Sequence, residues 1–129
     1  MTNVMTKDAT AIVEAYFAMW NEEDTAKRAR HIDEAWTDSG RYVDPARDAR
    51  GHGALNEMVS AARPHFPGHT VRRTSAIDSH HDQLRFAWQV IGPDGSVPVS
   101  GIDVGVLAPD GRLERITGFF GELAPEAAG

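Results

Sequence analysis

The fold of this chain is decided by residues 84–121, which read LRFAWQVIGPDGSVPVSGIDVGVLAPDGRLERITGFFG. Apolar and polar side chains alternate along the first part of this segment, as they do in a strand with one buried face. Two turn sequences, Gly-Pro-Asp-Gly at 92–95 and Ala-Pro-Asp-Gly at 108–111, lie where hairpins would reverse the chain. The segment therefore predicts a meander of antiparallel strands.

Two segments with helical periodicity precede the predicted sheet. Apolar residues recur at helical spacing over 8–21, where Asp8 is the expected N-cap, and over 24–36, where Asp24 is the expected N-cap. The apolar stripe of the second helix is narrow, and its other face is basic and includes Arg28. We expect Ser39 and Gly40 to end this second helical region.

The remaining elements complete an α+β order. A brief strand is predicted at 41–44, because Pro45 forces the residue before it into an extended conformation, and a turn should close it. A third helix runs from Gly53 until Pro64 stops it. Four antiparallel strands follow Gly68, the last two at 97–107 and 113–121. The predicted order is ααβα and then four strands, in one domain spanning residues 1–129 with a frayed tail at 123–129.

Composition narrows the function classes. Thirteen Lys and Arg against nineteen Asp and Glu give a net charge of −6, so the mean field of the protein repels nucleic acid. The chain has no cysteine, which excludes disulfides and thiolate metal sites. We find no signal peptide and no apolar run of membrane-spanning length. The default expectation is a cytoplasmic protein that binds neither nucleic acid nor membrane.

Asp103 is the most informative polar residue. It is the one ionisable group in Val99–Leu107, a strand that is otherwise apolar on both faces. A buried carboxyl group needs a partner or must stay protonated, and a protonated one can donate a hydrogen bond to a developing oxyanion. The alternative is a cross-strand ion pair, or exposure to solvent. The basic candidates for such a pair on neighbouring strands are Arg85, Arg112 and Arg115.

Two further residues are candidates for chemistry. Tyr16 lies on the apolar face of the first helix, where its hydroxyl needs a partner if the ring is buried. Asp44 immediately precedes Pro45. Each has a structural interpretation as well, because Tyr16 can be a core residue and Asp44 can be a turn residue that bonds its own backbone.

Four stretches together resemble a known family: YFAMWNEED (16–24), RYVDP (41–45), GIDVGVL (101–107) and DGRLERITGFFGE (110–122). The chain is similar to the nuclear transport factor 2-like (NTF2-like) superfamily, and within it to the SnoaL-like polyketide cyclases and ketosteroid isomerases, from Asp8 to Glu122. The resemblance implies a cone-shaped fold, in which a curved sheet wraps around helices and encloses an apolar pocket. Members of the superfamily often form homodimers through the outer sheet face.

The resemblance also implies residue roles. In ketosteroid isomerases a helix tyrosine and a strand aspartic acid form the oxyanion hole, while an aspartate before a proline moves the proton. By matching position, these roles fall to Tyr16, Asp103 and Asp44. The same resemblance implies a set of residues lining the cavity around a small apolar ligand: Trp20, Phe86, Trp88, Ile116, Gly118 and Phe120.

These features lead to one main functional hypothesis, that the chain is a cofactor-independent acid and base catalyst of the isomerase or cyclase type for a small apolar carbonyl compound. The alternative is a non-catalytic protein of this fold that binds a ligand or assists another subunit. An epoxide hydrolase is less favoured because no Arg and Asp are closely spaced on one strand. A dehydratase is also less favoured, and it would use His69, His80 or His81 as base. The histidines form no recognisable metal-ligand set, so no metal is expected.

Overall fold

The computed structural model describes residues 8–127. Within that range three α-helices and seven strands are arranged as an α+β fold, which confirms the predicted class. The helices are α1 (Thr10–Asn21), α2 (Thr25–Ala35) and α3 (His52–Ala62), and a 3₁₀ turn follows at Arg63–His65. The strands are β1 (Trp36–Asp44), β2 (Arg47–Arg50), β3 (Thr70–Arg73), β4 (Asp78–His80), β5 (Gln83–Ile91), β6 (Val99–Leu107) and β7 (Leu113–Phe120).

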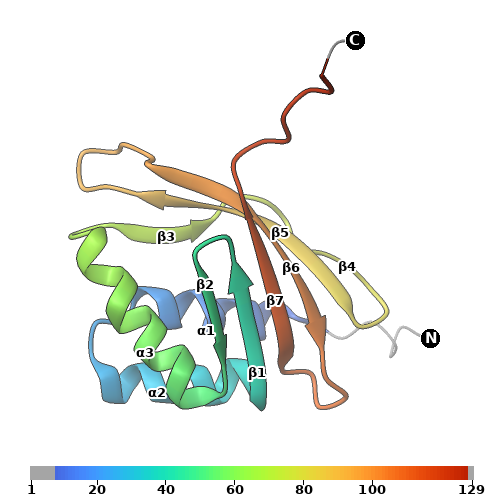
Figure 1. Cartoon of the computed structure of the whole chain (residues 1–129). Coiled ribbons are helices and arrows are strands. Elements are labelled where there is room, and N and C mark those ends of the chain that lie inside the picture. The colour runs from blue at the N-terminus through green and yellow to red at the C-terminus, as the bar shows by residue number, and fades with distance from the viewer. Residues whose placement is uncertain (1–7, 128–129) are drawn as a thin grey trace.

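All strands belong to one sheet with the order β2-β1-β7-β6-β5-β3, and β4 also pairs with β5 (Figure 1). Neighbouring strands are antiparallel, with the exception of β1 and β7, which run parallel. The predicted meander is therefore correct for the second half of the chain. The first strand joins it at the far side of β7, and this makes the sheet mixed.

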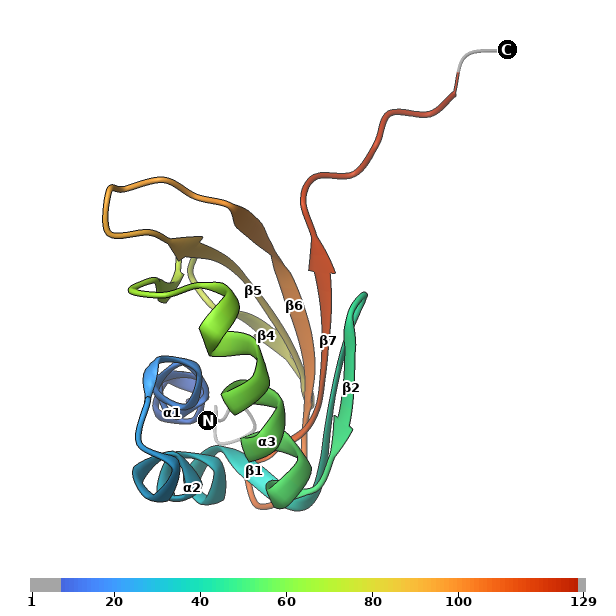
Figure 2. The same ribbon diagram turned by 60° about the vertical axis from the view of Figure 1, so that its left-hand side comes forward.

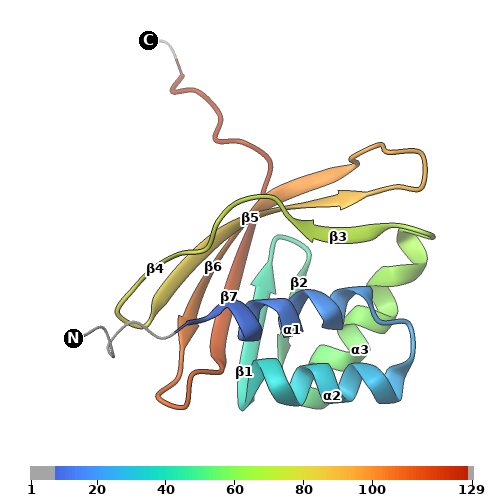
Figure 3. The same ribbon diagram turned by 180° about the vertical axis from the view of Figure 1, so that it is seen from behind.

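The sheet is strongly curved and the three helices lie against its concave face, as Figure 2 shows from the side and Figure 3 from behind. Large apolar side chains from both layers fill the space between them. Each contributes about 1.5–3 kcal/mol through burial. The fully buried members include Val13, Met19, Ile32, Trp36, Leu55, Val59, Leu113 and Ile116.

The boundary between the second helix and the first strand differs from the prediction. Helix α2 ends at Ala35, and Trp36 begins β1 opposite Leu113, so the strand is longer than the predicted 41–44 and passes through Ser39. Packing explains the difference, because the Trp36 side chain is fully buried between sheet and helices. A Cβ on Gly40 would lie 2.5 Å from Cε3 of this indole, so the glycine leaves the space that the ring occupies.

Strand β2 was not predicted. Its sequence is Arg-Asp-Ala-Arg, and only Ala49 is buried, so it carries almost no apolar pattern. It pairs with β1 as an exposed edge strand, and Arg41 and Asp48 form a cross-strand ion pair at 2.8 Å. Charged residues are the usual composition of an exposed edge.

The first of the four predicted strands after Gly68 is interrupted. Strands β3 and β4 pair with opposite ends of β5. Between them, the Thr74 backbone N–H donates to Ala87 O at 2.9 Å and the Ala87 N–H donates to Ser75 Oγ at 2.8 Å. A side-chain oxygen thus replaces one carbonyl of the ladder, and one edge strand becomes two.

The predicted N-cap is confirmed for α2 and is wrong for α1, where Ala9 and not Asp8 is the N-cap residue. Asp24 is the N-cap of α2, and its carboxylate accepts from the Lys27 N–H at 2.9 Å. Helix α1 begins at Thr10 rather than directly after Asp8, although Asp8 Oδ1 accepts from the Thr10 N–H at 2.9 Å. Such bonds satisfy N–H groups that have no partner within the helix.

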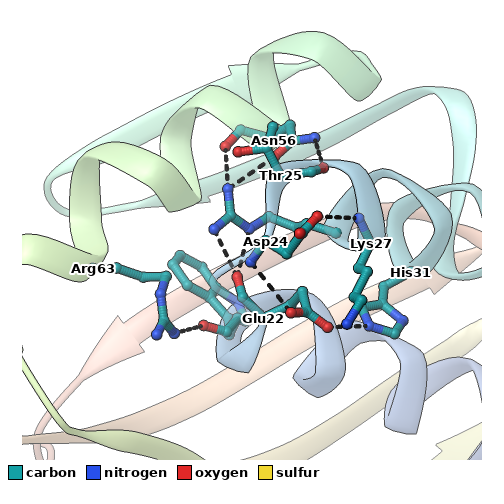
Figure 4. A network of polar contacts seen from close by, with 9 residues as sticks. Glu22, Asp24, Thr25, Lys27, His31, Asn56 and Arg63 are labelled. Carbon is teal, nitrogen blue, oxygen red and sulfur yellow. Dashed lines mark hydrogen bonds and ion pairs between the residues drawn. The ribbon is translucent and has the colours of Figure 1, made fainter.

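Arg28 is not on an exposed face, contrary to the amphipathic prediction for α2. It is 2% exposed. Its Nε and Nη2 donate to Glu22 O at 2.9 and 2.6 Å, and its Nη1 donates to Asn56 Oδ1 at 2.9 Å and Ser60 Oγ at 2.6 Å. Figure 4 shows this network between the α1–α2 connection and α3. The guanidinium therefore joins the helices to one another.

The C-terminal segment of the described chain lies outside the packed layers. Residues 122–127 form no helix or strand and extend away from the sheet, with Leu123 98% exposed (Figure 1). The frayed tail at 123–129 stays a prediction, and residues 128 and 129 lie outside the described range. Among residues 8–127, no helix is long and apolar enough to cross a membrane.

Candidate active site

A cavity of about 170 Å³ opens between α1, the 3₁₀ turn and the sheet. Seven aromatic residues line it: Tyr16, Phe17, Trp20, Tyr42, Phe66, Trp88 and Phe120. Five residues with acidic or basic side chains also border it: Asp44, Arg47, Arg63, His69 and Asp103. An apolar chamber with a few convergent polar groups is the usual form of a small-molecule site.

Asp103 lies on β6 with its side chain turned inward, and it is 2% exposed. Tyr16 Oη donates to its Oδ2 at 2.6 Å and Trp88 Nε1 donates to its Oδ1 at 2.9 Å. Burial raises the pKa of Asp103 to about 7, and the nearby charge of Asp44 acts in the same direction. The two hydrogen bonds favour the ionised form and offset only part of this rise in the pKa. At neutral pH both protonation states of this carboxyl group are therefore populated.

The donors around Asp103 decide where its proton can sit. An indole nitrogen only donates, so Oδ1 is an acceptor in either protonation state. When Asp103 is protonated, the proton is on Oδ2 and is donated to Tyr16 Oη, which frees the Tyr16 hydroxyl hydrogen for a ligand in the cavity. When Asp103 is ionised, it holds that hydrogen itself. The Tyr16–Asp103 pair thus has two states: one in which the Tyr16 hydroxyl can donate to a ligand, and one in which it donates to Asp103.

A second carboxylate belongs to the β1–β2 hairpin. Asp44 Oδ2 accepts from Tyr42 Oη at 2.7 Å and from Arg47 Nη1 at 3.1 Å, while its Oδ1 accepts from the Ala46 N–H at 2.8 Å. Tyr42 and Asp44 are two residues apart on one strand and therefore share a face. Three donors hold this carboxylate in a single orientation.

Gly118 on β7 separates the two carboxyl groups. It is paired with Asp103 across the β6–β7 ladder. A Cβ at this position would lie 2.9 Å from Asp103 Oδ1, 3.3 Å from the Asp44 Cβ and 3.3 Å from Tyr42 Oη. The missing side chain is what allows both groups to occupy one polar floor.

The structure places the predicted catalytic residues together. Tyr16, Asp44 and Asp103 all border one cavity, although they come from α1, β1 and β6. The ion pair considered for Asp103 is absent from the described residues: Arg85 bonds Asp78 at 2.8 Å, Arg112 bonds Asp110 at 2.9 Å, and Arg115 forms no pair with Asp103 within 4.0 Å. Asp103 therefore faces the cavity and hydrogen-bonds to neutral donors.

Three of the expected lining residues, Trp20, Trp88 and Phe120, border the cavity. Phe86 does not, because its ring packs 5.9 Å from that of Tyr16 and 5.3 Å from that of Phe17 in the core behind them. Ile116 is fully buried in the same core. Gly118 contributes space rather than contact.

Sequence reasoning missed several functional contacts. Trp88 was expected only as a wall, yet it fixes Asp103 through its N–H. The partners of Asp44 were also missed, although Tyr42 has the right spacing and Arg47 follows the tight turn at Pro45. Arg63 at the cavity edge gave no signal in the sequence.

The histidines proposed as possible bases separate into two groups. His69 borders the cavity, and its Nδ1–H donates to Pro67 O at 2.8 Å, which leaves Nε2 available. His80 and His81 lie at the β4–β5 turn, are exposed and do not border the cavity. Within residues 8–127, no three His, Asp or Glu side chains gather as a potential metal site.

Comparisons with known proteins agree with this geometry. A family model described as a SnoaL-like domain matches residues 13–116. A SnoaL-like family protein from Agrobacterium tumefaciens strain C58, provisionally designated an isomerase, is 36% identical, with 88% of this chain and 97% of that chain covered and a TM-score of 0.82. No curated protein matches significantly.

More distant structures share the fold. One from Jannaschia sp. CCS1, provisionally designated a SnoaL-like polyketide cyclase, is 16% identical with a TM-score of 0.67, and 93% of this chain and 90% of that chain are covered. Another, from Catenulispora acidiphila, has a ketosteroid isomerase-like fold and was solved in complex with trimethylamine. It is 15% identical with a TM-score of 0.67, and 83% of this chain and 82% of that chain are covered.

Proposed function

The chain belongs to the SnoaL-like domain family, and from this premise we propose that it is a cofactor-independent acid and base catalyst for a small apolar carbonyl compound. The reaction type is isomerisation or cyclisation through an enolate. One observation carries the proposal: the buried Tyr16–Asp103 pair lies on the floor of an aromatic cavity with a second carboxylate, Asp44, beside it.

Each residue has a defined role. Asp44 removes a proton from the carbon next to the carbonyl, and the C–H electron pair moves into the enolate. Tyr16 donates to the oxygen on which negative charge develops, and Asp103 acts through Tyr16 by supplying the hydrogen bond that frees its hydroxyl. Asp44 then returns the proton to a different carbon, or the enolate carbon attacks a second carbonyl, forming a C–C bond, and the resulting alkoxide takes the proton back from Asp44. The low polarity of the aromatic wall strengthens these interactions.

Phenols of graded acidity test the donor pair, because a bound phenolate resembles an enolate. We expect 2-naphthol and its more acidic derivatives to bind the wild type, with affinity that varies with phenol acidity and falls above pH 7 as Asp103 ionises. Asp103→Leu should weaken this binding by about tenfold or more, since one charge-assisted hydrogen bond is worth roughly that factor. Absorbance or fluorescence of the phenol follows its ionisation.

The control for this experiment is Ile102→Leu, a change on the same strand whose side chain faces away from the cavity. Equal binding of naphthols by wild type and Asp103→Leu would contradict the donor role and favour a protein that only holds a ligand. Once a substrate is identified, Asp44→Ala should abolish its turnover while binding persists. Unchanged turnover would rule out Asp44 as the base.

The proposal extends to assembly and compartment. We propose a homodimer formed through the outer face of β6 and β7, where Ile102, Val104 and Phe119 are 46%, 38% and 60% exposed. Large exposed apolar side chains on neighbouring strands are typical of an interface. The cytoplasm remains the proposed compartment, because a chain without cysteine fits a reducing environment.

A further inference from the structure

Arg63 brings a cation to the edge of the cavity. It follows α3 in the 3₁₀ turn and borders the cavity, and its Nη1 donates to Trp20 O at 2.9 Å. Figure 4 shows the Arg63 side chain beside the α1–α2 connection. A guanidinium has five N–H donors, and the bond to the Trp20 carbonyl uses one of them. The remaining donors are available to a ligand.

Within residues 8–127, no carboxylate that borders the cavity forms an ion pair with Arg63. Asp44 and Arg47 form an ion pair at 3.1 Å and cancel one another. Asp103 is held by two neutral donors on the polar floor. Among the residues that the structure describes, no carboxylate lies within 4.0 Å of Arg63.

The surroundings of Arg63 add a second cation. Arg28 lies close enough for the charge of Arg63 to lower the pKa of Arg28, after the larger effect of burial. Arg28 donates only to neutral oxygens of Glu22, Asn56 and Ser60. The carboxylates of Glu22 and Asp24 act on the pKa of Arg28 in the opposite direction, but neither bonds a guanidinium: Glu22 accepts from the Asp24 N–H and contacts His31, and Asp24 accepts from the Lys27 N–H. An anion beside Arg63 would relieve the repulsion between the two guanidinium groups.

We propose that the ligand of this cavity carries a carboxylate that Arg63 binds, at the end of the cavity away from Asp103. This deepens the proposed function, because it assigns the substrate class as an apolar, ring-containing keto acid. The carbonyl would face Tyr16, the ring would lie among the aromatic side chains, and the carboxylate would meet Arg63. Guanidinium and carboxylate groups form strong charge-assisted hydrogen bonds, which become stronger where water is partly excluded.

The dimensions fit such a ligand. Tyr16 and Trp20 are one turn apart on α1, so the Tyr16 hydroxyl and the guanidinium that contacts the Trp20 carbonyl approach the cavity from successive turns of the helix. An apolar cavity of about 150 Å³ accommodates benzene, and the cavity here is about 170 Å³ with an open side. One or two rings therefore fit.

A matched pair of probes without a hydroxyl group tests this inference separately from the oxyanion donors. We would titrate 2-naphthoate and 2-naphthamide, which have the same shape and differ in charge, into wild type, Arg63→Gln and Arg63→Lys. The control is Arg72→Gln, which removes the same charge from an exposed residue outside the cavity. Tryptophan fluorescence reports binding, and circular dichroism checks the fold.

We expect wild type to bind 2-naphthoate about tenfold more tightly than 2-naphthamide. Arg63→Gln should remove this preference and leave the affinity for 2-naphthamide within about twofold, Arg63→Lys should restore part of it, and Arg72→Gln should keep it. If Arg63 had only a structural role, as a cap of α1, Arg63→Gln would weaken the binding of both probes equally.

Two results would overturn the inference: failure of wild type to bind 2-naphthoate, or an unchanged preference in Arg63→Gln. Neither depends on Tyr16 or Asp103. If 2-naphthol binds in an Asp103-dependent manner while 2-naphthoate does not bind, the proposed function stands and the carboxylate assignment fails. If 2-naphthoate binding depends on Arg63 while Asp103→Leu leaves 2-naphthol binding unchanged, the carboxylate site is supported and the proposed oxyanion donors are contradicted.

Discussion

At the scale of single residues, Asp103 is unusual because its buried carboxyl group is held by a phenol and an indole rather than by a cation. Neutral donors compensate a buried negative charge only in part, so the protonated form is favoured. The folded protein therefore holds this proton up to about pH 7, whereas the ordinary value for the unfolded chain is 3.8.

This difference predicts how stability depends on pH. Between about pH 4 and pH 7 the folded state binds one more proton than the unfolded state at Asp103, so stability falls as the pH rises through this window. Asp103→Asn keeps a neutral group that can accept from Trp88 and donate to Tyr16. Relative to this variant, wild type should lose on the order of 4 kcal/mol between pH 4 and pH 8.

Urea denaturation of both proteins across this range measures the effect. Taking the difference between them removes the contribution of the other carboxylates, which act in the opposite direction. A constant difference in the free energy of unfolding from pH 4 to pH 8 would show that Asp103 is ionised in the folded protein throughout.

At the scale of elements, the helices are joined through a buried guanidinium. Arg28 on α2 contacts the carbonyl of Glu22 and two side chains of α3, Asn56 and Ser60. Removing it takes the donor from these partly buried acceptors, and a group left unsatisfied in a buried site costs about 1–3 kcal/mol. The arrangement also holds α3, and with it the 3₁₀ turn that carries Arg63.

Arg28→Met, which retains much of the side-chain volume, should therefore lower the free energy of unfolding by about 2–4 kcal/mol. Arg30→Met on the exposed face of the same helix should change it by less than about 0.5 kcal/mol. Thermal or urea denaturation of the two variants compares them directly. Equal losses would mean that the network in Figure 4 contributes little to stability.

Elements with strong periodicity could be predicted from the sequence, and those formed by tertiary packing could not. Strand β5 alternates clearly, β6 is an almost continuous apolar run, and Gly-containing turns separate β5, β6 and β7. Strand β2 has one buried residue, Ala49, so pairing with β1 alone makes it a strand. Trp36 continues an apolar helical stripe in the sequence, and only its place against Leu113 assigns it to β1.

At the scale of the whole molecule, one face of the sheet is covered by helices and the other is open. The exposed side chains of Ile102, Val104 and Phe119 on the open face are too apolar for a surface that meets only water. Burying them against a second copy of the chain would complete both subunits without obstructing either cavity, which lies on the opposite face.

Phe119→Asp should therefore convert a dimer to a monomer, because it places a charge at the centre of the interface. Val97→Asp is the matched control, since Val97 is 43% exposed in the β5–β6 connection outside this face. Sedimentation velocity at micromolar concentration distinguishes the two states. A wild type that sediments as a monomer throughout would contradict the dimer.

The acidic residues of the candidate site could be predicted from the sequence, whereas most of the side chains that contact them could not. Asp103 stands out because it interrupts an apolar strand, and Tyr16 and Asp44 were located by resemblance to the family. The roles of Trp88 and Arg63 depend on where side chains meet in three dimensions, across the β5–β6 ladder and beside the end of α1. Sequence spacing carries no information about such meetings.

The parallel pairing of β1 with β7 affects the order in which parts of the protein can fold during synthesis. Trp36 pairs with Leu113, and Asp44 shares its polar floor with Asp103 only across Gly118. Closing so long a loop costs entropy before the contacts are gained, and such non-local pairing slows folding. During synthesis the β1–β2 hairpin has no neighbour on its β7 side until the last strand leaves the ribosome. The cavity, with both of its carboxyl groups, can thus form only after β7 has been translated.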